Sequence, residues 1–322
     1  MKVADSTSEL SRILPTSDLQ ANPRDPGVLW GFYPPRFESG RRSTPWWLWW
    51  NILSLDAPAV AVVWSALFAS TSGARLSTAE AIALGLSVWI IYTCDRLLDG
   101  WTTKNRAALQ ERHLFSERHR LLLAASVIVA GALVLWQITG IPLIEDAIAG
   151  VKLGAVLILY MAAVHAGRGR LANVLPKEIF VGFLFALGAT LPLWSRATQF
   201  PWHEFLPWGF FGLLCSLNCL SIECWESARQ TRAWRQQSHP LVRWVAPRIN
   251  SIAAALALAA LAACFVQIPP SSSRFALLAV CAGALLILLL NCLRSKLSSA
   301  ALRVLADAAL FAPALIAFLI RR

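Results

Sequence analysis

Long apolar segments alternate with short polar ones along most of this chain. A transmembrane helix needs about 20 mostly apolar residues, and runs of about that length predict roughly nine membrane spans. The predicted spans are approximately Trp46–Leu67, Ser77–Leu98, Leu121–Thr139, Ala147–His165, Glu178–Trp194, Phe205–Glu223, Asn250–Ile268, Phe275–Cys292 and Ala300–Ile320. The runs are rich in Ala and Leu without two-residue alternation, which excludes an outer-membrane β-barrel. We therefore expect an all-α, polytopic membrane helical bundle.

Composition strengthens this prediction. Of 322 residues, 57% are hydrophobic and 15% are charged, and the mean hydropathy is +0.56, whereas soluble domains are about 25% charged. Such values exclude an ordinary soluble enzyme, a disordered chain and a disulfide-rich secreted module. Residues 1–45 are polar, contain several prolines and lack the apolar core of a signal peptide. They predict a flexible cytoplasmic tail before a transmembrane domain at 46–322.

The net charge of +11 is explained by topology. Of 29 basic residues, 21 fall on the N-terminal side of the predicted membrane and five on the other side, while Arg96, Lys152 and Arg303 fall within or at the edge of spans. Because basic residues concentrate in cytoplasmic loops, this distribution predicts a cytoplasmic N-terminus. The membrane we expect is the inner or plasma membrane of the cell. The expected surroundings are a lipid bilayer, and no nucleic-acid partner is expected.

Carboxylates near the end of the second predicted span are the first candidate for chemistry. Asp95 and Asp99 are four residues apart, so they share one helix face. Two like charges on one face repel each other unless a cation lies between or beside them. Mg²⁺ binds through one or two carboxylates and completes its octahedron with water and phosphate oxygens. The pair is therefore a candidate catalytic metal site, although a pair of solvated helix-end carboxylates explains the pattern too.

The sixth predicted span supplies a second acidic pair. Glu223 and Glu226 are three residues apart and lie at the same predicted side of the membrane as Asp95 and Asp99. Together the four carboxylates predict a site for metal ions that hold one diphosphate. Basic side chains would neutralise the phosphate oxygens. The candidate diphosphate-binding residues are Arg96, Lys104, Arg106, Arg112, Arg170, Lys177 and Asn218.

These residues resemble the UbiA superfamily of intramembrane prenyltransferases. The stretch Asp95-Arg96-Leu97-Leu98-Asp99-Gly100 is similar to the first aspartate-rich motif of that family, and the second acidic pair falls where the family has its second motif. The segment from Arg170 to Pro192 is similar to the basic loop and following helix. About nine spans with the N-terminus inside also agree, so the resemblance covers most of residues 46–320.

Two departures from the family pattern are clear. Ile91 stands where the family has a metal-binding Asn, and the second motif contains Glu223 and Glu226, with Asn218 upstream, in place of two Asp residues spaced by four. Glutamate also binds Mg²⁺, but its extra methylene moves the ligand atoms. These departures are typical of a divergent member with a different substrate, or of one that has lost catalysis.

The resemblance implies an activity. An isoprenyl diphosphate would bind at the cytoplasmic mouth of the bundle, Mg²⁺ held by the four carboxylates would ionise it, and the prenyl group would pass to an aromatic or lipidic acceptor. Aromatic side chains would shield the allylic cation, and the candidates are Tyr92, Trp89 and Tyr160.

Other functions remain open at this point. Capture of the cation by its own double bonds would make the protein a UbiA-type terpene cyclase. A non-catalytic membrane scaffold is favoured by Ile91, and a secondary transporter by the ionisable residues Asp56, Glu80 and Lys152 within apolar spans.

Overall fold

The protein is all-helical wherever its structure is described. The computed structural model describes residues 45–102, 115–116, 118–139, 154, 177–194, 205–229, 239–265 and 271–322, apart from the side chains of 99–102, 138–139, 194 and 271, and it has no strand in these ranges. The helices are α1 (Trp46–Ile52), α2 (Asp56–Thr71), α3 (Thr78–Thr102), α5 (Arg120–Thr139), α7 (Lys177–Trp194), α8 (Phe205–Arg229), α10 (Pro240–Val245), α11 (Ile249–Ala263), α12 (Arg274–Leu293) and α13 (Ser299–Arg321), with short 3₁₀ turns at Ala246–Arg248 and Ser271–Ser273.

Polar residues at the helix starts satisfy backbone groups that have no partner within the helix. Ser77 and Glu80 form a capping box at the start of α3: the Ser77 hydroxyl accepts from the Glu80 N–H, and the Glu80 carboxylate accepts from the Ser77 N–H. Ser298 accepts from the Ala301 N–H and caps α13. Glu80 therefore has a structural role at the end of the bundle opposite the acidic motifs, which weakens its value as an indication of a transporter.

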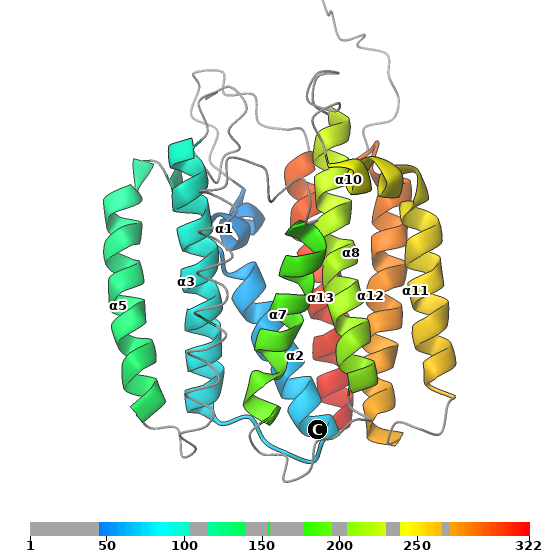
Figure 1. Ribbon diagram of the computed structural model, residues 1–322, viewed down its shortest axis with the longest axis horizontal. Helices are drawn as coiled ribbons and strands as arrows, with labels where there is room; N and C mark the ends of the chain where they lie inside the picture. Colours follow the sequence, from blue (N-terminus) through cyan, green and yellow to red (C-terminus); the bar gives the residue numbers. More distant parts are fainter. Residues whose placement is uncertain are drawn as a thin grey trace, which may run out of the picture. The chain divides into compact units, whose positions relative to one another are not determined.

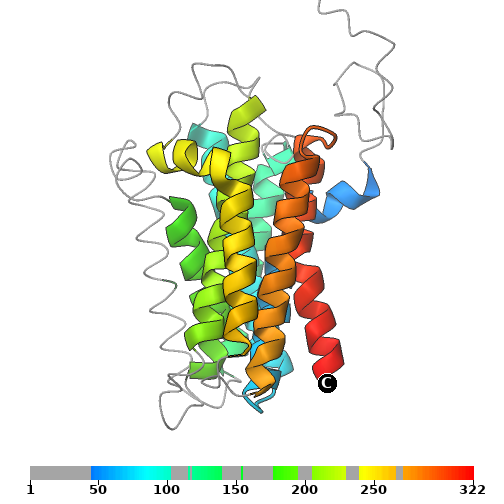
Figure 2. The ribbon, with the colours of Figure 1, turned by 90° about the vertical axis from the view of Figure 1, so that its right-hand side faces the viewer.

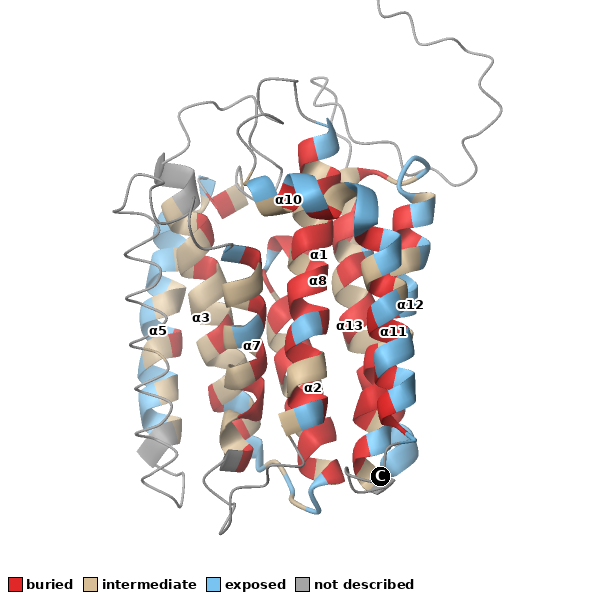
Figure 3. Ribbon diagram, turned by 45° about the vertical axis from the view of Figure 1, so that its right-hand side comes forward, coloured by how far each residue is buried: buried red, intermediate tan, exposed pale blue. Residues whose placement is uncertain are grey.

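Long helices lie side by side with α8 at the centre (Figures 1 and 2). Helix α8 contacts α7, α11, α12 and α13, while α2 contacts α3, α7 and α13, and α5 packs on α3. Burial follows this arrangement, since α2 and α8 are largely buried whereas much of α5 is exposed (Figure 3). In a bilayer, the exposed leucines and valines of α5 would face lipid.

An aromatic cluster joins three helices in the core. The rings of Trp64 on α2 and Phe211 on α8 stack with centroids 4.1 Å apart, and both side chains are fully buried. The Trp64 indole N–H donates to the Leu310 carbonyl of α13 at 3.0 Å. A buried indole needs such a partner, so this bond fixes α2 against α13.

Glycines permit close approach between helices at two places around α8. A Cβ atom at Gly182 of α7 would lie 2.5 Å from the Ser216 backbone nitrogen of α8, and one at Gly283 of α12 would lie 3.0 Å from the Ala309 carbonyl of α13 and from a Leu214 methyl. Glycine removes these clashes and lets the helices touch, as small residues do in membrane bundles.

Most of the predicted spans are confirmed as helices. Six helices in the described ranges are long and apolar enough to cross a membrane: Thr78–Leu98, Arg120–Gln137, Phe205–Arg229, Pro240–Ala263, Arg274–Leu293 and Ser299–Arg321. The fifth predicted span corresponds to α7, which is not among these six, and the fourth lies outside the described residues apart from residue 154. The count of nine therefore stays a prediction.

The first predicted span is bent. Helices α1 and α2 meet at a bend of 78°, and α1 extends sideways from the other helices (Figure 2). Trp46, Trp49 and Trp50 on α1 are 85%, 42% and 50% exposed. Indole rings of this kind prefer the membrane–water interface. The exposed tryptophans therefore suit an interfacial helix that lies beside the bundle better than a helix that crosses the membrane.

The bend has a local cause in the backbone. Ser54 has a positive φ of 59°, the Ser54 N–H donates to the Asn51 carbonyl, and the Leu55 N–H donates to the Trp50 carbonyl. This pair of bonds around a left-handed residue is the Schellman pattern that ends a helix. Helix α2 then begins at Asp56, whose carboxylate accepts from the Asn51 amide and from the Ala57 N–H.

Two side chains of α3 complete the corner between α1 and α2. The buried Arg96 guanidinium donates to the carbonyls of Asn51 and Ile52 at 2.7 and 3.0 Å. The Trp89 indole donates to the Leu53 carbonyl at 2.9 Å. Because these carbonyls lie where α1 ends, they need donors from elsewhere, and α3 supplies them. Arg96 and Trp89, predicted to bind diphosphate and to shield a cation, thus both contact the corner.

Removal of the Arg96 guanidinium should destabilise the corner. We expect Arg96→Met to lower the free energy of unfolding by roughly 2–3 kcal/mol, because the Asn51 and Ile52 carbonyls would lose charged donors in an apolar setting. Thermal unfolding in detergent would measure this loss. Arg243→Met, which changes an exposed arginine of α10, is the matched control and should unfold as the wild type does. Equal unfolding temperatures for the two variants would contradict this account of the corner.

Candidate functional site

Both predicted acidic motifs lie toward one end of the bundle. Helices α3 and α8 end on the same side in Figure 1, and α13 begins there. Asp95, Glu223 and Glu226 are all half-buried, and the Asp99 side chain lies outside the described part of the structure. The ends of α3 and α8, which carry the four predicted residues, thus lie on the same side of the bundle, as the sequence predicts.

The carboxylates do not form one cluster in the described residues. Helix α3 packs mainly on α2 and α5, whereas α8 packs mainly on α7, α12 and α13. Among the side chains that are described, no three of the types His, Cys, Asp and Glu are placed to hold a metal ion together. Since Asp99 is not among them, the four-carboxylate metal site stays a prediction.

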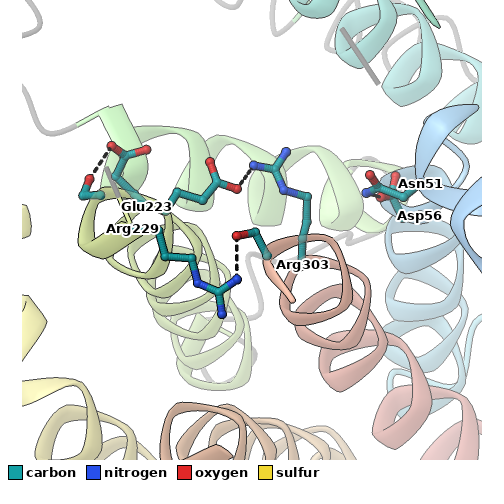
Figure 4. A network of polar contacts seen from close by, with 8 residues as sticks. Asn51, Asp56, Glu223, Arg229 and Arg303 are labelled. Atoms are coloured by element: carbon teal, nitrogen blue, oxygen red, sulfur yellow. Dashed lines mark hydrogen bonds and ion pairs between the residues drawn. The ribbon is translucent and has the colours of Figure 1, made fainter. Parts of the chain in front are cut away.

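Glu226 is engaged in an ion pair within the protein. Its carboxylate accepts from the Arg303 guanidinium of α13, and the two side chains are only 16% and 8% exposed (Figure 4). Arg303 would be costly to bury alone, and the pair neutralises it. Glu223, one turn earlier on α8, accepts only a 3.3 Å bond from the Ser227 hydroxyl among the contacts described here. Of the two glutamates, Glu223 is the better candidate for an external cation.

One face of α8 is only partly buried, whereas its neighbours on the same helix are buried. Cys219, Ile222, Glu223 and Glu226 are half-buried, whereas the intervening residues Leu220, Ser221, Cys224 and Trp225 are buried. The spacing of the half-buried residues is that of a single helix face. A ligand at this end of the bundle would therefore meet α8 along this stripe, which we call the open face of α8.

A second polar group lies deeper in the bundle. The Asn218 amide on α8 donates to the Asp307 carboxylate on α13 at 3.2 Å. The Tyr92 hydroxyl on α3 lies within electrostatic reach of Asp307 and of Asp56 on α2. We call these three residues, Asp307, Asn218 and Tyr92, the deep cluster. They come from α13, α8 and α3.

The depth of this cluster follows from helix geometry. With a rise of 1.5 Å per residue, Tyr92 lies about 4.5 Å further into the bundle than Asp95, and Asn218 lies about 7.5 Å further in than Glu223. Asp307 lies about 6 Å further in than Arg303, because α13 runs from this end toward the other. All three offsets have the same direction, so the deep cluster lies about one helical turn inside the acidic motifs.

Asn218 has an unsatisfied acceptor. Its side chain is 5% exposed, and its Oδ1 oxygen has no hydrogen-bond donor although its amide nitrogen is bonded to Asp307. A buried polar atom without a partner is uncommon and costly. This atom is thus a place where a bound molecule with an O–H or N–H group would be stabilised.

The remaining predicted residues have separate outcomes. Lys177 is exposed at the start of α7, within electrostatic reach of Cys219 on the open face of α8. The other basic candidates and one aromatic candidate lie outside the described residues: Lys104, Arg106, Arg112, Arg170 and Tyr160.

Sequence reasoning did not include Asp307, Arg303 or Asn51 in the site. The available signal was the presence of Arg303 and Asp307 four residues apart in an otherwise apolar span, since charges within a span mark function or pairing.

Comparison with known proteins gives no family. The sequence matches no protein-family model, and no curated protein and no solved structure matches the chain.

The pair of Glu226 and Arg303 makes a prediction about stability. We expect Glu226→Gln to lower the free energy of unfolding by about 3 kcal/mol, because it leaves the buried Arg303 charge without its counter-ion. The double variant Glu226→Gln/Arg303→Met should recover part of the loss, since neither charge then remains. Thermal unfolding of the two single variants and the double variant measures the coupling. Strictly additive effects would show that the two side chains do not depend on each other.

Proposed function

We propose that this protein is an integral membrane prenyltransferase that uses Mg²⁺ to ionise an isoprenyl diphosphate and transfers the prenyl group to a hydrophobic acceptor, aromatic or lipidic. The proposal is supported chiefly by the open face of α8, which carries Glu223 at the end of the bundle where α3 carries Asp95. A diphosphate bound there would have its charged end at the mouth of the bundle and its prenyl chain among apolar helices.

The carboxylates suit Mg²⁺ in a particular way. Mg²⁺ is usually held by one or two carboxylates together with phosphate oxygens and water, rather than by a cage of protein ligands. Asp95 with Asp99 would supply such a pair from α3, and Glu223 would supply one carboxylate from α8, whereas Glu226 is occupied by Arg303. When bound, Mg²⁺ would neutralise the diphosphate and stabilise it as a leaving group.

The roles proposed for the other residues follow from their contacts. Lys177, with Lys104, Arg106, Arg112 and Arg170, would bind the diphosphate oxygens as charged donors. Arg96, which follows Asp95 in the sequence, would act indirectly, because its guanidinium binds the carbonyls of Asn51 and Ile52 at the α1–α2 corner. Tyr92 is the described aromatic residue that we propose to face the cation, since Trp89 is bonded to the corner.

A secondary transporter is a second candidate, because the bend between α1 and α2 places the buried Asp56 at a break in the chain. Discontinuous helices line the substrate sites of many transporters. In those proteins both half-helices lie within the bilayer, whereas α1 has seven residues and three exposed tryptophans. The bend is therefore better explained by an interfacial helix, and the enzyme proposal is the stronger one.

Incubation of the purified protein with radiolabelled isoprenyl diphosphates of several chain lengths and Mg²⁺ tests the proposed activity. We expect Mg²⁺-dependent release of diphosphate that falls by at least about 10²-fold in Asp95→Asn, because a removed metal ligand weakens stabilisation of the leaving group. Glu223→Gln should also lower the rate. Glu9→Gln, which removes a carboxylate from the polar N-terminal segment, is the control and should keep wild-type activity.

The products distinguish the alternatives. Release without an added acceptor, together with a hydrocarbon product, would identify a cyclase. No release at any chain length, combined with no Mg²⁺-dependent binding of a diphosphate analogue, would refute the enzyme proposal and leave a scaffold. Flux of a solute into liposomes that contain the protein would instead identify a transporter.

A further inference from the structure

The deep cluster has the wrong charge for diphosphate. Asp307 and Asp56 are both carboxylates within electrostatic reach of Tyr92, and Asn218 directs its N–H donor at Asp307. An anion placed among these groups would be repelled. A cation would be stabilised there, and a proton could be accepted. The cluster therefore suits the steps after diphosphate has left, in which a cation forms and a proton is released. The prediction that Asn218 binds diphosphate does not fit its bond to Asp307.

The reaction proposed above releases a proton. The carbon–oxygen bond of the substrate breaks, and diphosphate leaves with the bonding electron pair. The allylic cation then gains electrons from an acceptor or from one of its own double bonds, which forms a new bond. In both cases neutrality is restored when a C–H or O–H bond breaks, leaves its electrons in the product and gives its proton to a base.

We propose that Asp307 is this base, positioned by Asn218 and assisted by Tyr92. The inference rests on the proposed function. Asp56 is a poorer candidate, because its bonds to Asn51 and to the Ala57 N–H hold the start of α2 at the α1–α2 corner. The carboxylates of Asp95 and Glu223 lie at the end where metal and diphosphate would bind, and Glu226 is neutralised by Arg303.

Asn218 supports this assignment in two ways. Its amide N–H bond to the Asp307 carboxylate fixes the orientation of the base. Its buried Oδ1 has no donor, so an O–H or N–H group of the bound acceptor would satisfy it beside the carboxylate. The Tyr92 hydroxyl lies within electrostatic reach of Asp307, and its side chain packs against the small cluster of Ala57, Ala61 and Val88 between α2 and α3.

The ratio of prenylated or cyclised product to prenyl alcohol formed by Asp307→Asn tests the proposal. The variant keeps the size of the side chain and a carbonyl acceptor for Asn218, but it cannot take up a proton. We expect diphosphate release to stay close to the wild-type rate while the yield of prenylated or cyclised product falls by about 10²-fold, the usual contribution of a positioned base. The cation should instead be captured by water, which gives the prenyl alcohol. Tyr92→Phe should shift this ratio in the same direction by a smaller factor.

The control is Glu80→Gln, which neutralises a buried carboxylate at the other end of the bundle, keeps the capping box of α3 and should leave the ratio of product to alcohol unchanged. A wild-type ratio of product to alcohol in both Asp307→Asn and Tyr92→Phe would overturn the proposal. Equal loss of diphosphate release and product in folded Asp307→Asn would also overturn it, because the residue would then act in ionisation. If Asp307→Asn does not fold, Tyr92→Phe decides alone. If the wild-type protein releases no diphosphate, the proposed function fails and this inference fails with it.

Discussion

The need to match buried charge governs how the central helices of this protein meet. A charged group enclosed by apolar helices is stable only when other polar groups satisfy it. Arg303 meets this need through Glu226, Arg96 through the carbonyls at the end of α1, and Asp56 through Asn51. Each of these contacts joins segments that are far apart in the sequence or that meet at a change of direction, so the same requirement fixes the α1–α2 corner and the approach of α13 to α8.

Because of these contacts, the charge of the candidate site changes from the end of the bundle toward its interior. Acidic motifs, which suit a metal ion, lie at the end of the bundle, and the Glu226–Arg303 pair lies beside them with no net charge. Deeper in the bundle, Asn218 and Asp307 form an anionic region that borders Tyr92. A substrate whose head is anionic and whose tail becomes a cation during reaction matches this order. The match between charge and depth connects the proposed activity with the proposed base.

Sequence patterns predicted the helical class, the positions of six membrane-length helices and the end of the bundle that holds Asp95, Glu223 and Glu226. They did not predict the break at Leu53–Leu55, because the apolar run continues through a corner that depends on the φ angle of Ser54 and on donors from α3. Helix spacing gave the face on which Glu226 lies, but its partner Arg303 is 77 residues away. Asp307 was visible as a charge in a span, yet only the packing of α8 against α13 gives it Asn218. Local pattern thus identifies which groups need partners, and tertiary packing decides which partners they find.

The glycine contacts around α8 have a consequence for ligand binding. Because Gly182 brings α7 against the backbone at Ser216, and the Leu214 side chain packs on Gly283 of α12, a rotation of α8 about its axis would create close contacts with both neighbours. Packing therefore favours one direction for its open face before any ligand arrives, which lowers the conformational entropy to be lost on binding. Selectivity at such a site would depend on how well the shape of the ligand fits a helix that its neighbours already hold.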